Sequence, residues 1–199
     1  SEAGPRLKIN FKETEQTHMA VGFHAISRFD PARFAATILN IILGANMSSR
    51  LFQEVREKRA LAYEISSHNK NYDDTGAFVI SAGVDAKKAP EALRVILKEL
   101  SKIKKEYASK DEFKRAKKFY KGQLLMALED TATSMFWIGE KVMAKERIVD
   151  IKKILEIIEK MTVEDVKKAA NMIFTKEYFN MAVIGPVKEE VFKDSLVLE

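Results

Sequence analysis

The hydrophobic pattern changes its period within residues 43–68, and this change constrains the fold more than any other feature of the chain. Before Ala60 apolar side chains recur at helical spacing, and after it apolar and polar side chains alternate as they do in a β-strand. Leu51, Phe52 and Val55 make the predicted buried face of the helix. The stretch therefore predicts a short helix that passes directly into a strand.

Turn-forming residues precede this helix. Gly44 follows an apolar helical segment, and glycine is the usual residue where a helix ends in the left-handed conformation. Asn46 and Ser48 come next, and their side-chain oxygens can cap a helix N-terminus. We therefore expect one helix to end at Gly44 and a second, shorter helix to follow this turn.

Two hydrogen-bonding side chains flank the helix–strand junction. Arg56 lies late on the predicted helix, and Tyr63 lies early on the strand, where alternation places Tyr63 on the same face as Ile65 and Ser67. A guanidinium and a phenol near one junction can both donate hydrogen bonds to the same carbonyl oxygen or carboxylate. The alternative is structural: Arg56 would pair with the Phe52 ring or a local acid, and Tyr63 would be half-buried packing.

The remaining pattern predicts paired strands and a group of helices. Alternation indicates strands at residues 6–12, 17–25, 61–68, 76–84 and 178–184, the third and fourth forming a hairpin. Helical spacing indicates a first helix from Asp30 and Pro31 to Gly44, with Pro31 at the first helical position. It indicates further helices at 87–107, 109–144, 151–158 and 162–173. The helix at 109–144 should break near 129–131, and Ser109 and Thr162 should cap the helices that they precede. This order favours an α+β fold, a mostly antiparallel sheet with helices packed on one face.

The length and composition fit a single domain that spans residues 1–199. The chain is 46% hydrophobic and 32% charged, which is enough apolar surface for a real core. No apolar run reaches the roughly 18–20 residues that cross a bilayer, and residues 1–5 are not a signal peptide. The absence of cysteine excludes disulfides and thiolate chemistry. We expect a cytoplasmic protein with no membrane partner.

The net charge of +5 raises the question of nucleic-acid binding. The basic residues alternate with acids along the predicted helices, as in residues 111–118, and this pattern is typical of a solvated helix face. We therefore expect no nucleic-acid partner. A salt-dependent shift with an oligonucleotide would revive that alternative.

At the junction the chain resembles a known family. Residues 47–54 read Met-Ser-Ser-Arg-Leu-Phe-Gln-Glu, residues 56–59 read Arg-Glu-Lys-Arg and residues 61–63 read Leu-Ala-Tyr. This succession is similar to the signature of the second, non-zinc domain of pitrilysin/insulinase-type zinc metallopeptidases, including their mitochondrial-processing-peptidase-like members. The paired Arg and Tyr of the family fall on Arg56 and Tyr63.

The resemblance extends over nearly all of the chain, with one departure. Later landmarks of the same family domain are similar, in the same order, to residues 111–117, 122–125, 128–129, 161–166 and 183–186. In place of the second and third glycines of the family turn, this chain has Ala45 and Asn46.

The resemblance implies a role for the pair and a set of partners. It implies that Arg56 and Tyr63 hydrogen-bond a substrate peptide near the scissile bond and stabilise the transition state. It further implies that residues 1–199 are the C-terminal domain of a longer two-domain subunit, and that zinc lies in a catalytic domain or partner subunit. The expected assembly is a homodimer or heterodimer. The rival interpretation is a non-catalytic structural or assembly subunit of the same family.

The zinc motif of such peptidases is absent from this sequence. No His-x-x-Glu-His is present, and the three histidines are His18, His24 and His68, none with a suitably spaced Glu. Ser48 and Ser49 have no neighbouring His, and no Gly-x-Ser-x-Gly elbow occurs. We therefore expect no metal, no cofactor and no peptidase activity in the isolated chain.

Overall fold

A computed structural model describes residues 6–144 and 150–195. The strands are β1 (Arg6–Phe11), β2 (Thr17–Ala25), β3 (Ala62–Asn71), β4 (Gly76–Val84) and β5 (Asn180–Gly185). The α-helices are α1 (Arg33–Leu43), α2 (Ala89–Lys105), α3 (Lys110–Glu129), α4 (Thr131–Met143), α5 (Ile151–Lys160) and α6 (Val163–Ile173). The described part also contains a π-helix, η1 (Phe52–Glu57), and the 3-10 helices η2 (Lys176–Tyr178) and η3 (Glu189–Ser195).

The strands form one sheet in the order β1-β5-β2-β4-β3. Neighbouring strands are antiparallel, except that β1 and β5 run parallel. The predicted hairpin of β3 and β4 and the mostly antiparallel sheet are therefore confirmed. The sequence did not predict that the first and last strands pair, with Leu7 opposite Met181.

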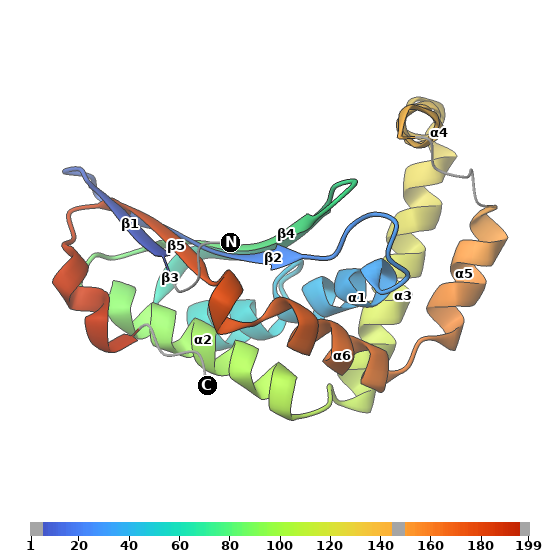
Figure 1. The fold of residues 1–199 in the computed structure, drawn as a ribbon. Coiled ribbons are helices and arrows are strands. Elements are labelled where there is room, and N and C mark those ends of the chain that lie inside the picture. The colour runs from blue at the N-terminus through green and yellow to red at the C-terminus, as the bar shows by residue number, and fades with distance from the viewer. Residues whose placement is uncertain (1–5, 145–149, 196–199) are drawn as a thin grey trace.

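Helices cover one face of this sheet. Figure 1 shows α1, α2 and α6 beneath the sheet, and no α-helix of the described residues lies over the opposite face. Aromatic rings fill the contact: those of Phe23 and Phe78 each lie 5.1 Å from the ring of Phe174, which follows α6. Burial of such rings is a large apolar contribution to folding. The predicted α+β architecture is confirmed.

The start of α1 differs from the prediction. Pro31 is not the first helical residue, because α1 begins only at Arg33. The carboxylate of Asp30 instead accepts the backbone N–H of Ala32 at 2.8 Å and holds a turn in front of the helix. Pro31 therefore belongs to that turn.

The reason for a glycine at the end of α1 also differs from the prediction. Gly44 has a φ of −160°, which is extended backbone and not the left-handed conformation. A Cβ at this position would lie 2.5 Å from Oγ of Ser67 on β3. Glycine is required because the chain passes so close to β3, whose Ser67 N–H donates to the Gly44 carbonyl at 3.0 Å.

The predicted caps of two helices in the second half are confirmed, whereas α2 is shorter than the predicted 87–107 and α5 extends beyond residue 158. Ser109 Oγ accepts the N–H of Glu112, and the Glu112 carboxylate accepts the N–H of Ser109, so α3 begins with a capping box. Thr162 and Asp165 make the same arrangement for α6. The break expected near residues 129–131 separates α3 from α4.

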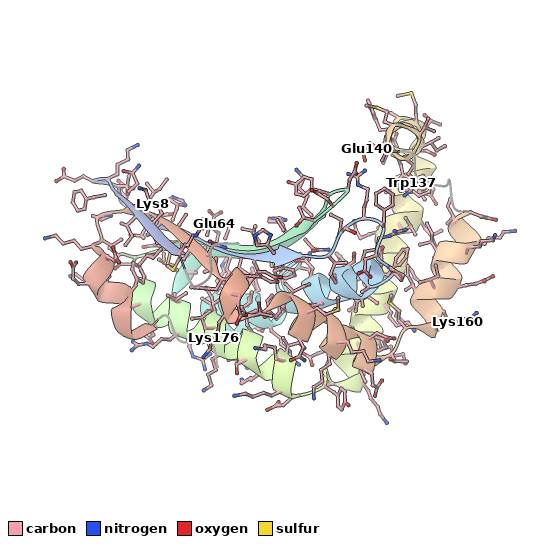
Figure 2. The ribbon with its side chains drawn as sticks, in the orientation of Figure 1. Lys8, Glu64, Trp137, Glu140, Lys160 and Lys176 are labelled. Carbon is pink, nitrogen blue, oxygen red and sulfur yellow. The ribbon has the colours of Figure 1, made fainter. Side chains whose placement is uncertain are left out.

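Helix α4 stands apart from this core. No residue of α4 is buried, although Met135, Phe136 and Val142 are large and apolar. In Figure 1 α3 rises past the end of the sheet and carries α4 beyond it, where Figure 2 labels Trp137 and Glu140. Helix α4 therefore adds little to the core, which lies between the sheet and the helices α1, α2 and α6.

Candidate functional site

Arg56 lies on a π-helix. The N–H of Lys58 donates to the carbonyl of Gln53 at 2.9 Å, a bond to the fifth preceding residue that defines the wider π turn. The N–H of Ala60 then donates to the carbonyl of Arg56 at 3.0 Å. The predicted short helix is thus present but over-wide at Arg56, and π turns of this kind occur frequently at functional sites.

The turn from η1 to β3 passes through a strained residue. Ala60 has a φ of 48°, the positive φ of the left-handed region, and no other non-glycine residue in the described ranges has a positive φ. For a residue with a Cβ this conformation costs roughly 1–2 kcal/mol. A hydrogen bond of 2.9 Å from the N–H of Leu61 to the carbonyl of Val55 accompanies it. Strain held by surrounding bonds is characteristic of functional segments.

A β-bulge directs the side chain of Tyr63. The register of β3 against β4 shifts between Ala62 and Glu64, so Tyr63 is the extra residue of the bulge. Its side chain is 56% exposed, whereas Ile65 and Ser67 are buried. The prediction that Tyr63 shares the face of Ile65 and Ser67 is therefore wrong, because the bulge interrupts the alternation.

Arg56 and Tyr63 line one open pocket of about 480 Å³. The other lining residues are Glu57, Ala60, Leu61, Ala62, Asp85 and Lys88. The walls come from η1, the start of β3 and the turn that leads from β4 into α2. This volume lies within the usual range of ligand pockets. A guanidinium and a phenol are thus presented to the same cavity.

The surroundings of Arg56 leave its hydrogen-bond donors available. Its guanidinium carbon lies 4.9 Å from the centre of the Phe52 ring, the contact that the structural alternative expected. The nearby acid Glu54 is engaged elsewhere: hydrogen bonds from Lys58 and Arg59 lower the pKa of its carboxyl to about 2. Within residues 6–144 and 150–195 Arg56 takes part in no salt bridge. Ring stacking orients this side chain without using its N–H groups.

Asp85 and Lys88 form the wall of the pocket that sequence reasoning missed. Nζ of Lys88 donates to the carbonyl of Ala60 at 3.0 Å, and the Asp85 carboxylate accepts the N–H of Lys87 at 2.8 Å. Both follow β4, whose Val84 pairs with Ala62 at the start of β3. The predicted hairpin could have identified these two residues, because pairing of its strands brings residues 85–88 beside the junction.

A second pocket, of about 300 Å³, lies between α1, the following turn and α3, and it does not contain the pair. Glu112 lines it and accepts two hydrogen bonds from Arg50, at 2.7 and 3.1 Å. Burial raises the pKa of the Glu112 carboxyl, but the bonds from Arg50 and Ser109 outweigh burial and lower it to about 2. This ion pair joins the segment that leads into η1 to the start of α3.

The described residues contain no set of side chains that fits zinc. No group of three or more His, Asp or Glu residues is placed to hold a metal ion within residues 6–144 and 150–195. The ring of His24 lies edge-to-face against that of Tyr178, with centroids 5.2 Å apart, and Nε2 of His68 lies 3.3 Å from the hydroxyl of Ser66. None of the described helices is long and apolar enough to cross a membrane.

Comparison with known proteins shows the family of the chain. Residues 2–120 match the family described as the peptidase M16 inactive domain. An uncharacterised zinc protease of Streptomyces coelicolor is 34% identical over 188 residues, which cover 94% of this chain and 41% of that protein. A solved peptidase M16 inactive domain from Pseudomonas fluorescens superposes with a TM-score of 0.84 at 23% identity, over 94% of this chain and 44% of the other. A chain of Complex III from Candida albicans has a TM-score of 0.81 at 18% identity, over 98% and 49%.

The family match and the fold define a metallopeptidase-type domain, whose described residues include no group placed to hold a metal ion. The chain belongs to the peptidase M16 family, as one of its inactive domains. The resemblance to pitrilysin/insulinase-type peptidases is confirmed, and the mitochondrial-processing-peptidase-like subgroup stays a prediction. The chain spans about two fifths of the length of the curated relatives that it matches, 41% of one and 42% of another.

Proposed function

We propose that this chain is the non-zinc half of a zinc peptidase and that it binds the substrate peptide through Arg56 and Tyr63. One observation carries the proposal: a π turn, a left-handed residue and a β-bulge, all within residues 52–64, direct both side chains into one pocket. Zinc belongs to a catalytic domain of the same protein or to a partner subunit. The pocket and that domain or subunit enclose the peptide between them, in a homodimer or heterodimer.

The chemistry of the pair is charge stabilisation. An Arg guanidinium and a Tyr hydroxyl can donate to one peptide carbonyl, and their hydrogen bonds strengthen as that oxygen gains negative charge in the transition state. Arg56 is held by the Phe52 ring and Tyr63 by the bulge, so both donors are preorganised. Neither acts as a nucleophile or proton carrier. Alone, the chain binds peptide without cleaving it.

Peptide hydrolysis by the whole protein, loaded with zinc, tests this function. Arg56→Ala and Tyr63→Phe should each lower turnover by roughly a hundredfold with zinc content and folding unchanged. Two matched controls should cleave like wild type. Arg94→Ala removes an exposed guanidinium on α2, and Tyr107→Phe alters a tyrosine of 54% exposure just after the end of α2; neither residue lines the pocket.

The outcomes separate this proposal from its rival. Normal turnover in both pocket variants would mean that Arg56 and Tyr63 serve only in packing and that the domain only encloses the peptide. A zinc-loaded wild type without activity would favour the structural or assembly subunit, for which the likeness to a chain of Complex III is the supporting observation.

A further inference from the structure

Lys88, which lines the pocket, bonds to the junction that carries Arg56 and Tyr63. Nζ of Lys88 donates a hydrogen bond of 3.0 Å to the carbonyl oxygen of Ala60. The two residues are 28 positions apart in the sequence. This bond therefore links the start of α2 to the left-handed turn between η1 and β3.

The backbone of Lys88 is a fixed anchor for this bond. Lys88 is the N-cap residue of α2, its N–H donates to the carbonyl of Asp85 at 3.0 Å, and its carbonyl accepts the N–H of Ala92 at 2.9 Å. The side chain then extends to the carbonyl of Ala60, in the turn that follows η1. Lys88 thus belongs to a helix whose inner face is buried.

Ala60 transmits its position to both members of the pair. Its N–H donates to the carbonyl of Arg56 at 3.0 Å, and the bulge at Tyr63 begins at Ala62, directly after the turn. Ala60 is in a conformation that costs free energy, with a φ of 48°. Without an external bond to its carbonyl the turn can relax, and Arg56 and Tyr63 then shift relative to each other.

We propose that Lys88 is a positioning residue for the Arg56–Tyr63 pair. It holds the carbonyl of Ala60 and thereby sets the separation and direction of the two donors. Lys88 also lines the pocket, but its Nζ is bonded to the Ala60 carbonyl, so in this proposal it acts through the turn. The inference rests on the function proposed above, because the pair must bind substrate for its spacing to affect turnover. A misplacement of about 1 Å is enough to cost catalysis heavily.

Turnover by the zinc-loaded whole protein tests this role. Lys88→Met keeps the length of the side chain and removes its donor, and it should lower kcat about fivefold to tenfold while KM changes less than about twofold. Lys88→Arg restores a donor and should recover most of the loss. Lys87→Met is the matched control, because the side chain of Lys87 is exposed and only its backbone N–H is bonded here. Equal turnover in Lys88→Met and wild type would overturn the inference.

A double variant separates positioning from direct contact. In an Arg56→Ala background, Lys88→Met should cause a smaller loss than it causes in wild type, because only Tyr63 is left for it to position. Losses that multiply would mean that Lys88 contacts the substrate itself, and would overturn the inference. If Arg56→Ala alone leaves turnover unchanged, the proposed function fails instead.

Hydrogen exchange gives a test that needs no activity. The amides of Ala60 and Leu61 bond the carbonyls of Arg56 and Val55. In Lys88→Met these two amides should exchange about fivefold faster than in wild type, and in Lys87→Met they should not change. Unchanged exchange in Lys88→Met would overturn the inference whatever the activity.

Discussion

Arg50 and Glu112 form a two-point ion pair across 62 positions of sequence, with nitrogen–oxygen distances of 2.7 and 3.1 Å. Arg50 lies just before η1, and Glu112 also caps α3. Bidentate geometry of this kind fixes direction as well as distance. The ion pair therefore ties the segment of the candidate site to the helix layer.

This ion pair predicts a stability that falls in acid. The pKa of Glu112 is about 2 in the folded chain against an ordinary 4.5, so its contribution is present above about pH 4.5 and is lost as pH falls towards 2. Glu112→Gln keeps a side chain suited to the capping box and should lower the free energy of unfolding at pH 7 by about 1–2 kcal/mol.

Urea titrations between pH 7 and pH 2 measure this effect. The difference between wild type and Glu112→Gln should shrink as the pH falls through that window. Glu91→Gln is the control, an exposed acid in the first turn of α2, and should leave the profile unchanged. A constant difference between wild type and Glu112→Gln across the whole range would contradict the assignment.

Glycine is required at position 44 for space. A Cβ at Gly44 would meet Oγ of Ser67 at 2.5 Å and its backbone nitrogen at 2.7 Å, so Gly44→Ala should destabilise the chain by about 1–3 kcal/mol. Gly122 has open space around it in α3, and Gly122→Ala should stabilise by about 0.5–1 kcal/mol. Denaturation midpoints of the two variants should therefore move in opposite directions. A stable Gly44→Ala variant would show that β3 can move away.

The left-handed turn predicts a stabilising substitution. Ala60→Gly removes the Cβ that opposes a φ of 48° and should raise the free energy of unfolding by about 0.5–1 kcal/mol. Ala127→Gly, on the exposed side of α3, should instead lower it by about 1 kcal/mol. Thermal unfolding compares the two directly. Destabilisation in both variants would mean that Ala60 is not strained.

Two phenylalanines should differ sharply in their contribution to stability. Phe78 is fully buried between sheet and helices, so Phe78→Ala should cost about 3–5 kcal/mol. Phe136 on α4 is 66% exposed, and Phe136→Ala should change the free energy of unfolding by no more than about 0.5 kcal/mol. Equal losses in the isolated chain would mean that α4 packs into the core.

Local patterns predicted the elements of this fold but not their arrangement. Alternation at Met19, Val21 and Phe23 is enough to identify β2, because each of these side chains is buried in one face of the sheet. The pairing of β1 with β5 depends on contacts over most of the chain length, and no local pattern records them. The strand order therefore had to come from the structure.

In the candidate site, too, the sequence predicted the residues but not their arrangement. The identities of Arg56 and Tyr63 followed from the family resemblance, but their convergence on one pocket depends on the π turn, on Ala60 and on the bulge. Each of these departs from regular periodicity, so periodicity predicted the wrong face for Tyr63. The contact of Lys88 with Ala60 lies across the hairpin and has no local signal.

The most direct test of the central claim is a double-variant cycle of peptide turnover in the zinc-loaded whole protein. Arg56→Ala, Tyr63→Phe and the combined variant are compared with wild type at equal zinc content. In the proposed function both donors act on one oxygen, so each single variant should lose roughly a hundredfold and the combined variant clearly less than the product of the two losses. Single variants within about twofold of wild type would contradict the claim that this pocket binds the reacting peptide.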